Sequence, residues 1–137
     1  MRRAPSSRAG AAAVELAVLL PFLMFLALVT VDWARVFYYA VIINNCARQG
    51  AVYASDPVAA SQSPYASVTD AALADAFDLQ PQPTVSAAGG VDADKNPYMD
   101  VTVTWQFPLV TNYPLIGSSV QLSRTVRARV APAAPNG

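Results

Sequence analysis

The chain contains no histidine and only one cysteine among its 137 residues. Without histidine it lacks the commonest general base and imidazole metal ligand, and a single thiol excludes an intramolecular disulfide. Acidic and basic side chains are equal in number, so no bulk basic field attracts nucleic acid. These absences argue against an enzyme, a zinc module and a nucleic-acid-binding protein, and they predict no cofactor. The lone Cys46 lies in a helical pattern and is predicted to be a buried small residue, with a reactive or intersubunit thiol as the alternative.

What the chain does have is a long apolar run over residues 11–31, AAAVELAVLLPFLMFLALVTV. Its one ionisable residue is Glu15, and no polar face recurs at helical spacing. As a helix the run would be about 30 Å long, which matches the hydrocarbon core of a bilayer. Pro21 is compatible with such a helix, because neighbouring groups can satisfy the carbonyl that it frees. The run predicts a membrane-spanning helix.

Residues 1–10 form a polar leader that is rich in arginine. Only Arg35 and Arg48 follow the span closely, so the positive-inside bias predicts a cytoplasmic N-terminus and an extracytoplasmic remainder. A cleaved secretory signal fits less well, because the apolar run is too long and Asp32 occupies a position that requires a small residue. A plain signal anchor remains an alternative.

Glu15 lies about one helical turn inside the span, where a carboxylate is costly, on the order of 3 kcal/mol at the bilayer centre and less near the interface. A plain anchor has no use for this residue. If the chain is cut after Gly10, Ala11 carries a new α-amino group whose reference pKa of about 8 leaves it mostly cationic. That cation could pair with Glu15 of a neighbouring helix and fix the axial register between packed subunits.

These residues carry a resemblance to a known family. Gly10, Ala11 and Glu15 at the head of an apolar run resemble the processing site of type IV prepilins, in which a membrane aspartyl peptidase cuts after the glycine. Two further elements, DWAR at 32–35 and NCARQGAVYA at 45–54, are similar to TadE-like pseudopilins of tight-adherence (Flp) pilus systems. The residues of this family motif are Asp32, Trp33, Arg35, Asn45, Ala47, Arg48, Gly50 and Tyr53.

The resemblance implies a minor pilin-like membrane subunit that is processed after Gly10 by a prepilin peptidase and helps to assemble a tight-adherence pilus. It implies as partners that peptidase, sibling pseudopilins, subunits of the pilus assembly machinery and the lipid bilayer, with no nucleic acid. It also implies a single-pass protein of the bacterial inner membrane, with its C-terminal domain in the periplasm. The alternative function is an uncleaved, membrane-anchored extracytoplasmic binding module. An enzyme is the third and least supported class.

Residues 32–55 contain no proline and are predicted to continue the helix as a stalk outside the membrane, for a total of about 65 Å with the span. Asp32 and Arg35 are expected to form a weak surface pair, and Gly50 to loosen the end of the helix. Trp33, Tyr38 and Tyr39 are expected near the outer membrane boundary. An apolar stripe is predicted to pack only within the chain's own core or, alternatively, on both its own sheet and sibling subunits: Val36, Ala40, Ile43, Ala47 and Ala51.

Residues 56–137 are predicted to form an extracytoplasmic α+β domain with a disordered tail. A loop is expected over 56–64, except that Ser63 and Pro64 should start a short helix. The apolar face predicted for that helix consists of Val68, Ala72, Leu73, Ala76 and Phe77.

The period of the pattern then changes from helical to two. Residues 98–107 and 120–130 alternate between apolar and polar side chains, and 84–87 is expected to be a short edge strand. Residues 108–117 are interpreted as a connection, and 92–96 as a solvated turn rather than a calcium loop. The predicted fold class is α+β: a long N-terminal transmembrane and stalk helix packed on a small antiparallel sheet of about three strands, with one short extra helix.

Overall fold

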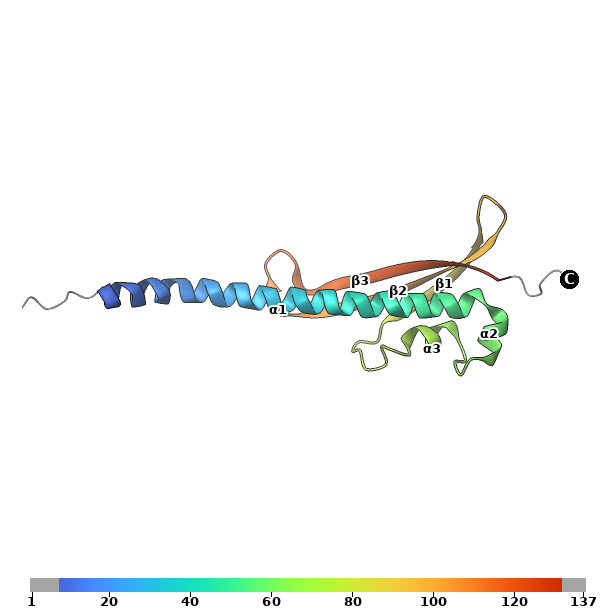
Figure 1. The fold of residues 1–137 in the computed structure, drawn as a ribbon, viewed down its shortest axis with the longest axis horizontal. Coiled ribbons are helices and arrows are strands. Elements are labelled where there is room, and N and C mark those ends of the chain that lie inside the picture. Colours follow the sequence, from blue (N-terminus) through green and yellow to red (C-terminus); the bar gives the residue numbers. More distant parts are fainter. Residues whose placement is uncertain (1–7, 132–137) are drawn as a thin grey trace, which may run out of the picture.

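One helix of 48 residues, α1 (Arg8–Ser55), forms the long axis of the molecule (Figure 1). The structure is a computed structural model that describes residues 8–131; the predicted tail beyond that range and most of the predicted leader lie outside the described residues. Pro21 lies inside α1 without ending it. The prediction of a single helix that runs through span and stalk is confirmed, although the helix already begins at Arg8 rather than at Ala11.

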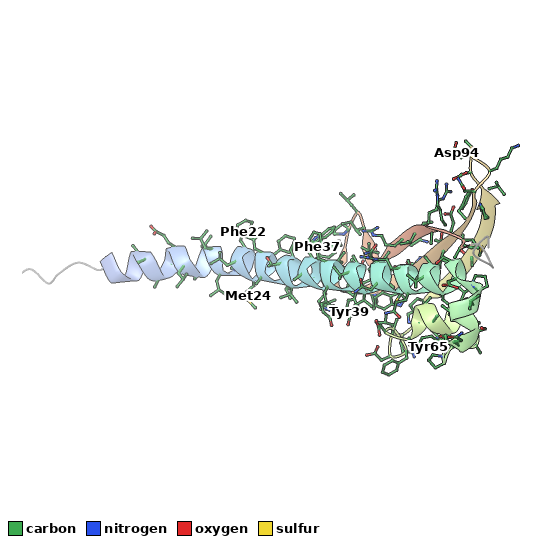
Figure 2. All side chains as sticks on the ribbon, turned by 45° about the vertical axis from the view of Figure 1, so that its right-hand side comes forward. Phe22, Met24, Phe37, Tyr39, Tyr65 and Asp94 are labelled. Carbon is green, nitrogen blue, oxygen red and sulfur yellow. The ribbon has the colours of Figure 1, made fainter. Side chains whose placement is uncertain are left out.

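The N-terminal half of α1 extends away from the rest of the chain, and its large apolar side chains are exposed on every side (Figure 2). By length and composition α1 can cross a membrane. Its C-terminal half lies along a three-stranded antiparallel sheet. The α+β fold class is therefore confirmed.

The sheet has the order β1 (Thr84–Val91), β2 (Pro97–Tyr113), β3 (Gly117–Arg129). The predicted alternation sets its faces, because Val103, Trp105 and Phe107 of β2 are buried against α1 while the residues between them are more exposed. β1 is longer than the predicted 84–87 because it continues through Gly89 and Gly90. A side chain at position 90 would collide with the outer end of the Tyr98 ring on β2, which would have to move to admit it.

The core lies between α1, the sheet and a short helix, α3 (Val68–Leu73). Ile43, Cys46 and Ala47 are completely buried on α1, which confirms the predicted stripe and the predicted burial of the thiol. Burial raises the pKa of the Cys46 thiol above its ordinary value. The stripe therefore packs on the chain's own sheet, as both alternatives predicted.

The segment between α1 and the sheet departs from prediction at several points. The expected loop contains a helix, α2 (Pro57–Gln62), whose N-cap is Asp56: its carboxylate accepts hydrogen bonds from the backbone N–H groups of Val58 and Ala59. The Asp-Pro pair thus both ends α1 and starts α2.

The next helix does not start at Ser63. Ser67 is the N-cap of α3 and accepts a hydrogen bond from the backbone N–H of Asp70, so the prediction placed the start too early. Phe77 is 77% exposed and does not join the apolar face, because α3 ends at Leu73 and the helical period stops there. Ala76 is buried as predicted, and Leu79 is buried in place of Phe77.

Candidate functional site

The carboxylate of Asp32 joins α1 to the far end of β2. It is only 1% exposed. The backbone N–H of Val110 donates to its Oδ1 at 2.9 Å, and the backbone N–H of Thr111 donates to its Oδ2 at 3.0 Å. The hydroxyl of Tyr113 donates to the same Oδ2 at 3.1 Å. We call this set of four residues the Asp32 anchor.

The anchor replaces ladder hydrogen bonds that β2 cannot form. The register between β2 and β3 is interrupted between Pro108 and Tyr113, so the amides of that stretch need other acceptors. Asp32 supplies both of its carboxylate oxygens. The end of β2 is therefore attached to α1 at Asp32, the first residue after the predicted membrane span.

The charge of Asp32 suits these partners. The hydrogen bond from the Val110 backbone N–H holds the pKa of the Asp32 carboxyl below its ordinary value, although burial acts in the opposite direction. Burial raises the pKa of the Tyr113 hydroxyl, and Asp32 adds to that rise. At neutral pH an ionised acceptor thus faces only donors.

The predicted pairing of Asp32 with Arg35 is confirmed, but Asp32 is buried rather than exposed. Arg35 does contact it, with Nη1 at 3.4 Å from Oδ1, and its guanidinium also lies 4.9 Å from the centre of the Phe107 ring. The helical pattern could not reveal that β2 covers this position. Arg35 closes the anchor from the solvent side, where it remains 37% exposed.

The boundary aromatics divide into two groups. Trp33 is 42% exposed and packs beside Phe37, and Tyr38 is 65% exposed, as expected for side chains near an interface. Tyr39 instead turns into the core, where its ring centre lies 5.1 Å from that of Trp105 and 5.2 Å from that of Phe107. Tyr39 thus contributes to the core of the outer domain, while Trp33 and Tyr38 remain at the surface.

The second part of the family motif lies where the C-terminal end of α1 meets the sheet. Gly50 is buried, and a Cβ built there would lie 2.9 Å from Cγ1 of Val101 and 3.0 Å from Cβ of Ala72. This glycine allows α1, β2 and α3 to approach closely, and α1 continues past it to Ser55, so the predicted loosening is not seen. Ala47 of the same motif is also buried.

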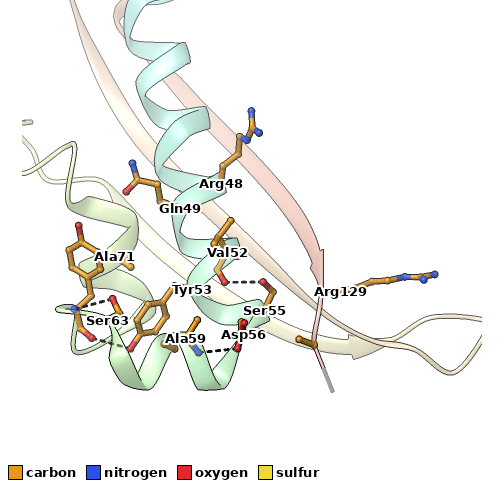
Figure 3. A pocket seen from close by; sticks show the side chains of 13 residues that line it. Arg48, Gln49, Val52, Tyr53, Ser55, Asp56, Ala59, Ser63, Ala71 and Arg129 are labelled. Atoms are coloured by element: carbon orange, nitrogen blue, oxygen red, sulfur yellow. Dashed lines mark hydrogen bonds between the residues drawn. The ribbon is translucent and has the colours of Figure 1, made fainter. Parts of the chain in front are cut away.

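The other motif residues of this stretch are at the surface. Asn45 is exposed, and Arg48 and Tyr53 line a pocket of about 650 Å³ at the end of α1 (Figure 3). The hydroxyl of Tyr53 donates to the backbone carbonyl of Tyr65 at 3.2 Å, which ties α1 to the α2–α3 connection. Arg129 of β3 also borders this pocket. It offers two cations and an apolar wall, and its one carboxylate, Asp56, already caps α2.

The turn over 92–96, which was predicted to be a solvated turn, is held by its own hydrogen bonds. Oδ1 of Asp92 accepts hydrogen bonds from the backbone N–H groups of Asp94 and Asn96, and Arg129 lies 3.3 Å from its Oδ2. Within the described residues no cluster of three or more histidine, cysteine or acidic side chains could hold a metal ion. The hydrogen bonds to Asp92 make this segment a turn, and Asp94 and Lys95 within it are exposed.

Gly10, Ala11 and Glu15 all lie in the first turns of α1 and are exposed. No ion pair among the side chains that the structure describes involves Glu15. Its carboxylate is thus open to a partner outside this chain. The structure does not bring these residues near the Asp32 anchor, because Asp32 lies further along the same continuous helix.

Sequence reasoning missed Val110, Thr111 and Tyr113, the partners of Asp32. The sequence did offer one signal. The stretch between the two alternating segments is bounded by Pro108 and Pro114, and because proline cannot donate a ladder hydrogen bond, strand pairing there is expected to be incomplete. The backbone N–H groups of that stretch therefore required an acceptor outside the sheet. Nothing in the local pattern pointed to Asp32.

The anchor leads to a prediction about stability. Asp32→Ala is expected to lower the Tm of the protein in detergent by about 5 to 10 °C, because three donors lose a charged acceptor. Amide exchange at Val110 and Thr111 should accelerate by about tenfold or more. Asp94→Ala, at an exposed turn position, is the control and should change neither quantity. Unchanged exchange at both amides would show that the anchor does not hold β2.

A further variant, Asp32→Asn, tests how the stability of the protein depends on pH. The folded-state pKa of Asp32 is below its ordinary value of 3.8, so its contribution is present above that value and is lost as pH falls through the folded pKa. A backbone N–H from Asn96 lowers the pKa of Asp92, and Arg127 lowers that of Asp100. Asp32→Asn should therefore reduce the acid destabilisation below about pH 4 without abolishing it.

Together these features describe a protein whose single apolar N-terminal helix continues as the spine of a small α+β domain. Residues 10–52 match the model of a family described as TadE-like protein, which confirms the resemblance over that segment. The matched range contains Gly10, Glu15, Asp32 and Gly50. No curated protein and no solved structure matches the chain. The match supports a structural protein associated with a tight-adherence pilus, and α1 indicates single-pass membrane anchoring.

Proposed function

We propose that this chain is a minor pilin-like subunit that is trimmed after Gly10 by a prepilin peptidase and helps to assemble a tight-adherence pilus. The observation that carries the proposal is the N-terminal half of α1, where an exposed apolar surface bears one carboxylate, Glu15, that forms no ion pair with any side chain the structure describes. The TadE-like match covers the same surface. Such a surface fits lateral packing of one helix against another.

The proposed layout divides the chain into four parts. Residues 1–10 are a cytoplasmic leader, 11–31 span the bacterial inner membrane, 32–55 form the stalk, and 56–137 form the periplasmic domain. The excess of arginine in the leader supports this orientation. The partners are the peptidase, sibling pseudopilins and other subunits of the assembly machinery.

The mechanism is physical. Removal of the leader would give Ala11 an α-amino group, and Glu15 of a neighbouring subunit would pair with it inside the bilayer. A mismatch of one turn would leave both charges unpaired in a medium of low dielectric, so the pair selects one axial register. The Asp32 anchor then transmits this register to the outer domain, because it holds the sheet against the same helix.

The test is mass analysis of the protein purified from cells with and without the candidate peptidase. With the peptidase, the chain is expected to begin at Ala11; without it, residues 1–10 should be retained. An intact N-terminus in both preparations would contradict the proposal. That result would favour the alternative function, an uncleaved anchor for a binding module, for which the pocket beside Arg48 and Arg129 would be the candidate binding surface.

A further inference from the structure

The two ends of β2 carry turns of opposite chemistry. The turn that connects β1 to β2 is charged and polar, with Asp94 and Lys95 exposed. The turn that connects β2 to β3, Pro114–Ile116, is apolar: Leu115 is 99% exposed and Ile116 49% exposed. Turns in water usually consist of polar residues, glycine and proline, so two large aliphatic side chains at a tip require an explanation.

The positions of the two turns match their chemistry. The Asp32 anchor ties Val110 and Tyr113 to the residue that follows the predicted span, so the apolar turn lies beside α1 where its uncovered apolar half begins (Figure 1). Asp94 lies at the opposite end of the domain, far from the apolar half of α1 (Figure 2). The apolar turn is thus continuous with the surface that would enter the bilayer.

We propose that the apolar turn, residues 114–116, inserts into the outer interfacial layer of the lipid bilayer as a second membrane contact. Val110, 68% exposed on the strand leading to the turn, adds to the apolar tip. Trp33 and Tyr38 lie on α1 within two turns of the anchor and supply side chains suited to the same depth. The inference rests on the proposed membrane insertion of α1.

The contact would restrain a motion that a single helix permits. One spanning helix can rotate about its own axis and tilt at little cost. A second lipid contact displaced from that axis limits both motions, and the anchor couples it rigidly to α1. Glu15 would then face a defined direction before it meets a neighbour.

The test uses a fluorescent probe on a single cysteine, in the full chain with Cys46→Ala to remove the one native thiol. The probe is attached at Leu115→Cys, at Asp94→Cys as the matched turn control, and at Leu23→Cys as the span control. Leu115 and Asp94 are exposed, so neither change disturbs the core. The protein is placed in vesicles of phosphatidylethanolamine and phosphatidylglycerol that carry nitroxide quenchers either near the headgroup or deep in the acyl chain.

Shallow quenchers are expected to quench the probe at position 115 several-fold more than the probe at position 94, and deep quenchers should act most strongly at position 23. Quenching at 115 no stronger than at 94, with position 23 quenched, overturns this inference and leaves membrane insertion of α1 intact. Loss of quenching at position 23 contradicts insertion itself, and with it both proposals. If the fluorescence of the probe at position 115 changes with the amount of protein per vesicle but not with the lipid quencher, the turn contacts a second copy of the chain. That result would also overturn the inference.

Discussion

Gly10→Val is expected to leave the chain at full length in cells that contain the peptidase, whereas Ala12→Val should be trimmed like the unaltered chain. Glycine has no side chain, so a peptidase can approach the backbone on both sides of the bond after it. In this structure Gly10 lies in the first turn of α1, where glycine is less favourable than alanine by about 1 kcal/mol and eases local unwinding. A β-branched valine removes the open approach.

The measurement is the intact mass of each variant. A Gly10→Val protein that lacks its first ten residues would contradict the assignment of the processing site. Ala12→Val is the matched control because it places the same valine side chain in the same exposed stretch of helix, beyond the bond to be cut. Reduced trimming of both variants would instead indicate a general effect of bulk near the N-terminus.

Local patterns predicted most of the fold. The apolar run and the absence of helix breakers over 32–55 were sufficient for α1, and alternation was sufficient for the centres of β2 and β3. The short helices were less predictable, because a six-residue helix such as α2 or α3 offers fewer than two turns in which a period can appear. Their starts depended on which of several Ser and Asp residues accepted the capping bonds, and tertiary packing decided between them.

The candidate site shows the same division. Gly10 and Glu15 could be proposed from the sequence alone because their proposed roles depend on spacing along one helix. The role of Asp32 could not, because its partners are 78, 79 and 81 residues away in the sequence. Gly50 was interpreted as a weak point of the helix for a similar reason: the atoms that require its small size belong to Val101 and Ala72, which no local pattern places beside it.

The distant contacts explain how events inside the membrane could reach the outer domain. α1 and β2 run in opposite directions, so Asp32 meets the end of β2 while Gly50 packs on Val101 near its start. The sheet is therefore attached to the helix at both ends, and the backbone N–H of Ala131 adds a bond to the carbonyl of Ser55 at 2.7 Å. A change in axial register at Glu15 would move the whole domain with the helix.

Glu15→Ala is expected to leave membrane insertion unchanged and to reduce co-purification with pilus-assembly subunits by about tenfold or more. Breaking a buried ion pair costs about 3 to 5 kcal/mol, and 1.4 kcal/mol already corresponds to tenfold; the shallow position of Glu15 favours the lower part of that range. Insertion should persist because the variant span is more apolar. Carbonate extraction checks insertion, and affinity capture of the tagged subunit checks assembly.

Leu16→Ala is the matched control, because it shortens an adjacent side chain that is 57% exposed without removing a charge. It should lose far less co-purification than Glu15→Ala, and equal losses would show that apolar area rather than the carboxylate decides assembly. The double variant Gly10→Val, Glu15→Ala is a stricter test of the proposed pair between Glu15 and the amine of Ala11. In an uncut Gly10→Val chain, Ala11 has no free amine, so adding Glu15→Ala should cause little further loss. A full, additive loss in that background would mean that the Glu15 carboxylate acts on some group other than the amine released by trimming.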